Sequence, residues 1–220
     1  MNFTPIYTMD FIARKISRIA GDLLLYSILT AALSGWCLAW YYVPVPEKAI
    51  VSILNLKESV FAGRIVLAIH SLSALIVLPL CLVFAGAAFF IKIQYRAKLR
   101  LIVPPIIILI LGISGKIAGL MLSADQQAVS VLKKAFLTPP APGTSLPLLF
   151  DDFSMVFFRT FLFHALVIPG LILFVLYLLL KHSKTILNSD NRNPVVRHST
   201  RFAAYVTVLI IIAYFFRNIV

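Results

Sequence analysis

Long apolar runs separated by short polar stretches dominate the sequence. Four of these runs reach or exceed the roughly 20 residues that an α-helix needs to cross the hydrocarbon core of a membrane. They cover residues 23–43, 65–91, 101–122 and 153–180. A fifth run, residues 202–216, is shorter. The pattern predicts an all-α integral membrane protein with a bundle of four transmembrane helices and one additional C-terminal transmembrane helix.

The composition agrees with this class. Of the 220 residues, 61% are hydrophobic and 13% are charged, whereas a soluble domain has about 45–50% apolar and about 25% charged residues. The net charge of +12 does not indicate a nucleic-acid partner, because the basic residues lie between the apolar runs instead of gathering on one face. Cys37 and Cys81 both lie inside apolar runs, where we expect packing residues and no disulfide.

The distribution of basic residues predicts the orientation. Twelve Lys and Arg residues lie in the stretch before residue 23, between residues 91 and 101, and between residues 180 and 202; seven lie on the opposite side of the bundle. The positive-inside rule therefore places the N-terminus in the cytoplasm and the C-terminus outside it. We expect a multi-pass protein of the cell inner (cytoplasmic) membrane.

The chain then divides into four parts. These are a cytoplasmic N-terminal segment (1–22), a four-helix bundle (23–180), a basic cytoplasmic loop (181–201) and a fifth helix (202–220). Residues 49–60 and 125–136 also show apolar residues at helical spacing. We expect both to form short helices on the membrane surface.

Two histidines, His70 and His164, lie alone inside the second and fourth apolar runs. These two helices run in the same direction, so the imidazoles are expected at a similar depth. An ionisable side chain in hydrocarbon is costly and marks a functional site by default. Two convergent imidazoles in an apolar setting with few acids favour the axial ligands of a b-type haem. The alternative is that both are polar residues satisfied by hydrogen bonds between helices.

Several further residues stand at characteristic positions around these histidines. They are Gly21 and Gly35 in the first run, Gly63 seven residues before His70, Gly119 near the end of the third run, Arg159 five residues before His164, and Arg192-Asn193-Pro194 after the fourth run. In this order and spacing, the chain from about Gly21 to Pro194 resembles the N-terminal four-helix domain of cytochrome b from quinol:cytochrome c and plastid-type oxidoreductases. The resemblance implies that Gly35 and Gly119 let a haem approach the backbone and that Arg159 pairs with a haem propionate.

The departures from the family pattern concern the second haem of that family. Where the family has a second histidine on each ligand helix, this chain has Phe84 on one and Leu178 or Leu179 on the other. Pro105 stands fourteen residues before Gly119, where a second haem would require glycine. The resemblance therefore implies one haem b, at the outer-side site with His70 and His164 as iron ligands, and no second haem.

One change affects the outer site itself. Leu67 stands three residues before His70, where the family usually has an arginine. We hypothesise that Lys116, one turn from Gly119, supplies the missing positive charge near a propionate. The alternative is that Lys116 extends to the lipid headgroups.

These features favour a mono-haem membrane subunit of an electron-transfer complex. It would relay electrons between the quinone pool or a redox subunit and an extracytoplasmic partner, such as a c-type cytochrome or an iron–sulfur subunit. No catalytic residues are expected, because the sequence shows no nucleophile–base pair, phosphate loop or carboxylate dyad. Two alternatives stay open: a haem-free structural anchor for other membrane subunits, and an anchor that binds quinone or lipid in the vacated inner site.

Overall fold

The structure is a computed structural model that describes residues 5–122, 153–187 and 194–216. The elements in these ranges are α1 (Pro5–Tyr41), α2 (Pro46–Glu58), α3 (Gly63–Phe89), α4 (Tyr95–Leu122), α6 (Phe153–Leu162), the π-helix η1 (Phe163–Val167), α7 (Ile168–Leu187) and α8 (Pro194–Phe216). Four helical spans are long and apolar enough to cross a membrane: Met9–Tyr41, Gly63–Phe89, Tyr95–Leu122 and Phe157–Ser183. The predicted all-α membrane fold is confirmed, with a shorter apolar C-terminal helix at Arg201–Phe215.

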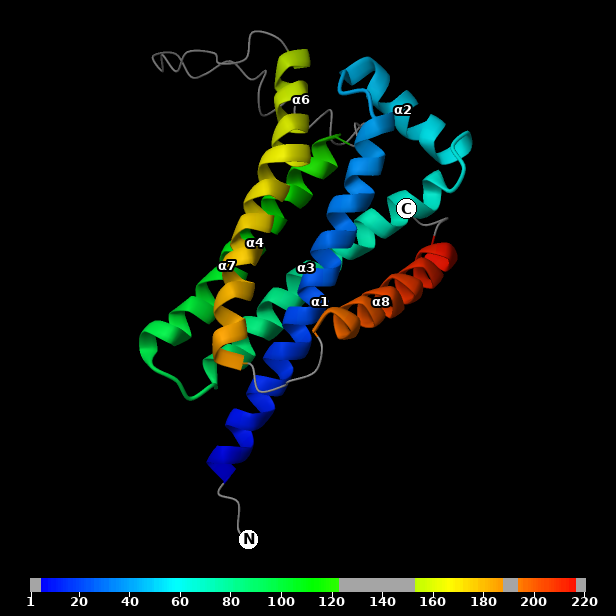
Figure 1. Ribbon diagram of the computed structural model, residues 1–220. Coiled ribbons are helices and arrows are strands. Elements are labelled where there is room, and N and C mark those ends of the chain that lie inside the picture. Colours follow the sequence, from blue (N-terminus) through cyan, green and yellow to red (C-terminus); the bar gives the residue numbers. More distant parts are fainter. Residues whose placement is uncertain (1–4, 123–152, 188–193, 217–220) are drawn as a thin grey trace, which may run out of the picture.

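The four long helices form a closed ring (Figure 1). Helix α1 packs on α3, α3 on α4, α4 on α7, and α7 returns to α1. Consecutive helices in this ring run in opposite directions, so α3 and α7 run the same way and stand across the ring from each other. Segments α6, η1 and α7 follow one another without a break. The ring therefore gives each of the diagonal helices α3 and α7 the same two neighbours, α1 and α4.

Prolines set the boundary between α1 and α2. Helix α1 ends at Tyr41, just before Pro44, and Pro46 occupies the first turn of α2 after the extended residue Val45. Proline fits the first turn of a helix but not its interior, because it lacks a backbone N–H. The helix predicted at residues 49–60 is thus present, and its Ala49 is buried against α4 and α6. The helix predicted at residues 125–136 lies outside the described residues.

Helix α1 begins at Pro5, well before the apolar run that starts at residue 23. A side chain in this extension binds the connection between α3 and α4. Asp10 accepts a hydrogen bond from the backbone N–H of Lys92 (2.7 Å) and pairs with Arg14 (2.9 Å). The bond between Lys92 and Asp10 joins the N-terminal turns of α1 to this connection, and Ala13 in the same turns is buried in the apolar core.

Helix α8 packs on the outside of the ring against α3 and α1. Arg201 pairs with Asp22 at 2.8 Å, and the hydroxyls of Tyr205 and Ser27 lie 2.8 Å apart. The ring of Tyr26 also lies against that of Tyr205, with 6.1 Å between centroids. Hydrogen bonds between helices partly replace the hydrophobic driving force that is missing inside a lipid bilayer.

The interior of the ring contains two apolar clusters. The larger cluster fills the end where α1 starts, and its members include Leu24, Val77, Phe84, Ile108 and Leu179. The smaller cluster lies at the α2 end and is formed by Ala49, Leu122 and Phe157 with Tyr42, Met121 and Phe161 around them. His70 and His164 lie between these two clusters, in the middle of the ring of helices.

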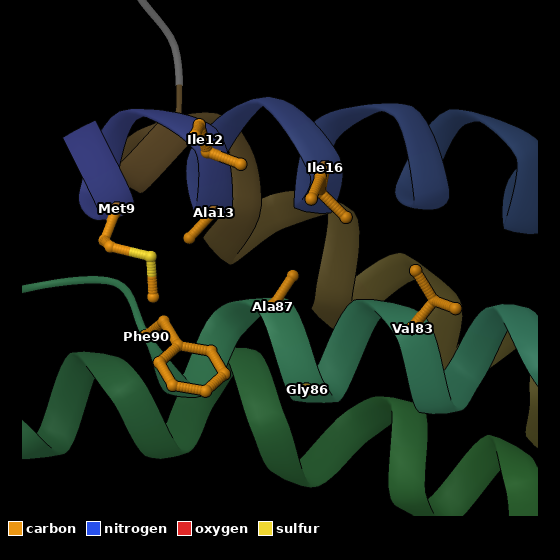
Figure 2. Close-up of a pocket in the computed structure, with 8 residues that line it drawn as sticks. All are labelled: Met9, Ile12, Ala13, Ile16, Val83, Gly86, Ala87 and Phe90. Carbon is orange, nitrogen blue, oxygen red and sulfur yellow. The ribbon is translucent and has the colours of Figure 1, made fainter.

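The outer surface of α1 and α3 carries a shallow groove of about 320 Å³ near the N-terminal end (Figure 2). It is lined by Met9, Ile12, Ala13, Ile16, Val83, Gly86, Ala87 and Phe90. Small residues form its floor and larger side chains form its rim. The lining side chains are all apolar.

The larger cluster predicts which phenylalanine matters most for stability. Phe84 is 1% exposed, whereas Phe174 on α7 is 59% exposed. Removing a buried phenyl ring leaves a cavity and costs about 3 kcal/mol or more. We therefore expect Phe84→Ala to lower the melting temperature in detergent clearly and Phe174→Ala to change it little. Equal shifts for the two variants, measured by thermal unfolding, would contradict the assignment of Phe84 to the core.

Candidate functional site

The structure brings His70 and His164 together. His70 lies on α3 and His164 in η1, on the two diagonal helices. Their ring centroids are 6.2 Å apart, and the ring planes meet at 78°. Both side chains are partly buried inside the ring of helices. The expectation that the two imidazoles meet at one depth is therefore confirmed.

Each imidazole donates a hydrogen bond to a backbone carbonyl on a neighbouring helix. His70 Nδ1 lies 2.9 Å from the carbonyl oxygen of Ala31 on α1, and His164 Nδ1 lies 2.9 Å from that of Gly115 on α4. A carbonyl oxygen can only accept, so the hydrogen must be on Nδ1 in both rings. Each Nε2 then carries a lone pair that makes no hydrogen bond within the described residues. This arrangement is typical of a metal-ligating histidine, whose second nitrogen is fixed by a backbone acceptor.

Two glycines make these bonds possible. Gly35 follows Ala31 by four residues, and Gly119 follows Gly115 by four residues. A Cβ atom at Gly35 would lie 2.8 Å from Cε1 of His70, and one at Gly119 would lie 3.0 Å from Cε1 of His164. A side chain at either position would push the ring away from its carbonyl. Both glycines that were expected to admit a cofactor thus contact the predicted ligands.

The turn that carries His164 is a π-helix. The N–H of Ile168 bonds to the carbonyl of Phe163, five residues earlier. Pro169 follows directly, and a proline inside a regular α-helix clashes with the carbonyl four residues before it, here that of Ala165. The wider turn lies just before Pro169 and contains Ala165. Single π-turns within α-helices occur frequently at functional sites, and this one contains the predicted ligand.

The α2 end of the site is closed by Tyr42. Its hydroxyl donates to the carbonyl of Leu122 at 2.6 Å, and its ring stacks on Phe161 with 5.5 Å between centroids. Burial raises the pKa of Tyr42 well above the ordinary value, so the hydroxyl stays protonated and remains a donor. Between the histidines and the α2 end of the ring of helices, the aromatic side chains of Tyr42 and Phe161 therefore pack together.

The position predicted to have lost its ligands is filled with hydrocarbon. Phe84 lies fourteen residues after His70, and its ring contacts Gly21, where a Cβ atom would be 3.1 Å away. On the opposite helix Leu179 is fully buried, while Leu178 is partly exposed. Pro105 is also fully buried. At this level, side chains that cannot ligate iron are closely packed.

The two basic residues assigned to the propionates have exposed side chains. Lys116 directly follows Gly115 on α4, and Arg159 lies on α6, before the turn that carries His164. Their proximity to the histidine pair is known only along the chain, Lys116 next to Gly115 and Arg159 five residues before His164. The roles of both residues stay predictions.

Sequence reasoning missed the backbone acceptors and one hydroxyl. The carbonyls of Ala31 and Gly115 were not foreseen, nor was Ser34, whose Oγ lies 3.5 Å from His70 Nδ1. The sequence contains no signal for these carbonyls, because every residue has one and only the rotation of the helices brings those of Ala31 and Gly115 to the imidazoles. The π-turn was not foreseen either, and Pro79, Pro104 and Pro105 lie inside α3 and α4 without such a turn.

The donor set fits a macrocyclic metal cofactor better than a bare metal ion. Among the described residues no group of three or more His, Cys, Asp or Glu side chains could hold a metal ion. Two imidazoles alone leave a bare ion with too few protein ligands. The ring centroids of His70 and His164 are 6.2 Å apart, so both imidazoles could contribute to one cofactor site.

Comparison with known proteins supports the fold. The chain is similar to a solved chain titled "Hyperthermophilic respiratory Complex III", with a TM-score of 0.64 and 16% sequence identity. The match covers 99% of this chain and 60% of that chain, so this chain spans about three fifths of the length of its structural neighbour. No family model and no curated protein sequence matches. The likeness supports the helical fold, and the four apolar helices indicate a multi-pass membrane protein.

The glycine contacts give a prediction with a matched control. Gly35→Ala places a methyl group against His70, so we expect its Nδ1–H to lose the bond to Ala31. Gly86→Ala serves as control, because a Cβ atom there meets nothing within 4 Å. The measurement is ¹⁵N NMR of labelled histidine side chains in detergent without added cofactor. A His70 signal that is unchanged by Gly35→Ala would contradict the proposed packing.

Proposed function

We propose that this chain is a mono-haem cytochrome b-like membrane subunit of an electron-transfer complex. His70 and His164 would hold the iron of one haem b through their Nε2 atoms. The observation that carries the proposal is the matched geometry of the pair: both Nδ1 atoms are bonded to carbonyls, and the ring centroids are 6.2 Å apart. When bound, a haem with two imidazole ligands supplies one-electron transfer between its ferric and ferrous states.

The residues of this chain would prepare the site for that chemistry. The two carbonyl acceptors fix the tautomer and the orientation of each ring before any cofactor binds. Gly35 and Gly119 keep the space beside the rings free of side-chain atoms. The apolar clusters above and below exclude water, which favours electron transfer without competing chemistry. Lys116 and Arg159 would place positive charge near the propionates.

The structural neighbour supports an assembly with other membrane subunits, because it is a chain of a respiratory complex. We infer a position in the cell inner membrane with the N-terminus in the cytoplasm, on the strength of the basic residues at that end. The haem would then lie nearer the outer face. Electrons would pass between the quinone pool or a redox subunit and an extracytoplasmic partner, such as a c-type cytochrome or an iron–sulfur subunit.

We do not propose that quinone or lipid binds at the inner site, the level at which Phe84 replaces a histidine of the family. Phe84, Leu179 and Pro105 are all fully buried at that level. A haem-free anchor role remains the competing hypothesis, and the haem content of the purified protein separates the two.

The direct test is a reduced-minus-oxidised spectrum of the purified chain, expressed with sufficient haem. We expect the absorption bands of a low-spin b-type haem and one haem per chain. His70→Ala and His164→Ala should each abolish these bands, because one imidazole cannot replace two. His182→Ala, which alters a histidine at the far end of α7, should leave them unchanged. Wild-type protein without haem would favour the structural anchor.

The charge hypothesis has its own test. The ferric haem carries one more positive charge than the ferrous haem, so a nearby cation disfavours the ferric state. Lys116→Met removes that cation and should shift the haem reduction potential to more negative values. Lys98→Met removes a charge at the opposite end of the same helix and serves as control. Potentiometric titration measures both. An unchanged potential in Lys116→Met would show that this side chain reaches only the lipid headgroups.

A further inference from the structure

The two histidine sites match closely but differ by one hydroxyl group. Around His70, the Nδ1 atom lies 2.9 Å from the carbonyl oxygen of Ala31 and 3.5 Å from Oγ of Ser34. Ser34 directly precedes Gly35. On the other side, the residue directly before Gly119 is Ala118, which has no polar side-chain atom. His164 therefore has one oxygen near its Nδ1–H where His70 has two.

The orientation of the Ser34 hydroxyl follows from its own bonds. Its oxygen lies 2.6 Å from the carbonyl oxygen of Thr30 and 3.2 Å from that of Ala31. Both carbonyls only accept, so the hydroxyl hydrogen points back along α1. The lone pairs of Oγ remain on the side that faces His70. Ser34 is 8% exposed, so little water screens the dipole from the imidazole.

Two opposing effects on His70 can be ranked by these distances. Donation from Ser34 to the carbonyl of Ala31 would weaken that carbonyl as an acceptor for Nδ1–H. The bond to Thr30 is much shorter, however, and takes most of the hydroxyl hydrogen because hydrogen bonds weaken with distance. The remaining effect of Ser34 is the negative end of its dipole beside Nδ1–H.

We propose that Ser34 is a positioning residue that makes His70 the more electron-donating of the two ligands and so lowers the reduction potential of the bound iron. The proposal rests on the proposed haem function. An acceptor beside Nδ1–H increases the electron density of the ring and the donor strength of Nε2. Stronger donation favours the ferric state, and hydrogen bonding around axial ligands is one of the means by which proteins set haem potentials.

The matched positions provide a two-sided experiment. Ser34→Ala removes the hydroxyl beside His70, and Ala118→Ser adds one at the equivalent place beside His164. Potentiometric titration of the haem-loaded chains should show a shift to more positive potential in Ser34→Ala and to more negative potential in Ala118→Ser. Ser34→Thr keeps a hydroxyl and should stay close to wild type. A second readout is the ¹⁵N chemical shift of the His70 side chain, which should change in Ser34→Ala alone.

The outcomes separate this inference from the function on which it rests. Haem-loaded Ser34→Ala with wild-type potential would overturn the role of Ser34 and leave the haem function intact. A wild-type chain without haem would overturn both. If Ser34→Ala does not fold, Ser34→Thr and Ala118→Ser decide the question, and an unchanged potential in Ala118→Ser would count against the mechanism.

Discussion

The structure depends on one kind of hydrogen bond, from an imidazole Nδ1–H to a carbonyl oxygen within a neighbouring helix. Inside a bilayer no water is available, so a buried imidazole N–H must find its acceptor in the protein. Helix carbonyls are already engaged in their own helix, and a second donor can reach one only where the covering side chain is absent. Gly35 and Gly119 provide that access, four residues after the two acceptors. The glycines, the tautomer of each ring and the free Nε2 atoms are therefore parts of a single arrangement.

This arrangement also joins neighbouring helices of the ring in two pairs. The diagonal helices α3 and α7 carry the imidazoles, and the flanking helices α1 and α4 carry the acceptors. Each histidine thus links a diagonal helix to a flanking one. Association of helices in lipid relies on close packing and hydrogen bonds, because lipid chains are as apolar as the helix surfaces. The same bonds that orient the imidazoles join α3 to α1 and the α7 segment to α4.

Much of this could be predicted from the sequence, and the limits have physical causes. Hydropathy located the four long helices, and the isolation of His70 and His164 in apolar runs indicated the site. The start of α1 was missed because its first turns mix apolar residues with charged ones such as Asp10, Arg14 and Lys15, so they form no continuous apolar run. The acceptors were missed because backbone atoms leave no trace in composition, and they emerge only when helix rotation is known.

The ring of helices contains two similar glycine contacts, one with His70 and one with Phe84, and the difference between them affects how electrons could pass through this chain. The contact between Gly21 and Phe84 repeats, fourteen residues along both helices, the contact between Gly35 and His70. Fourteen residues correspond to about 21 Å of helix. A phenyl ring has no N–H group, so the contact between Gly21 and Phe84 needs no hydrogen-bond acceptor and offers no nitrogen for a metal. If a haem binds at the level of His70, the level of Phe84 contains only hydrocarbon side chains and no second electron carrier. Electron transfer across the full membrane would then require a carrier on another subunit. If this chain alone carried the electrons, the donor and the acceptor would both have to approach it at the α2 end.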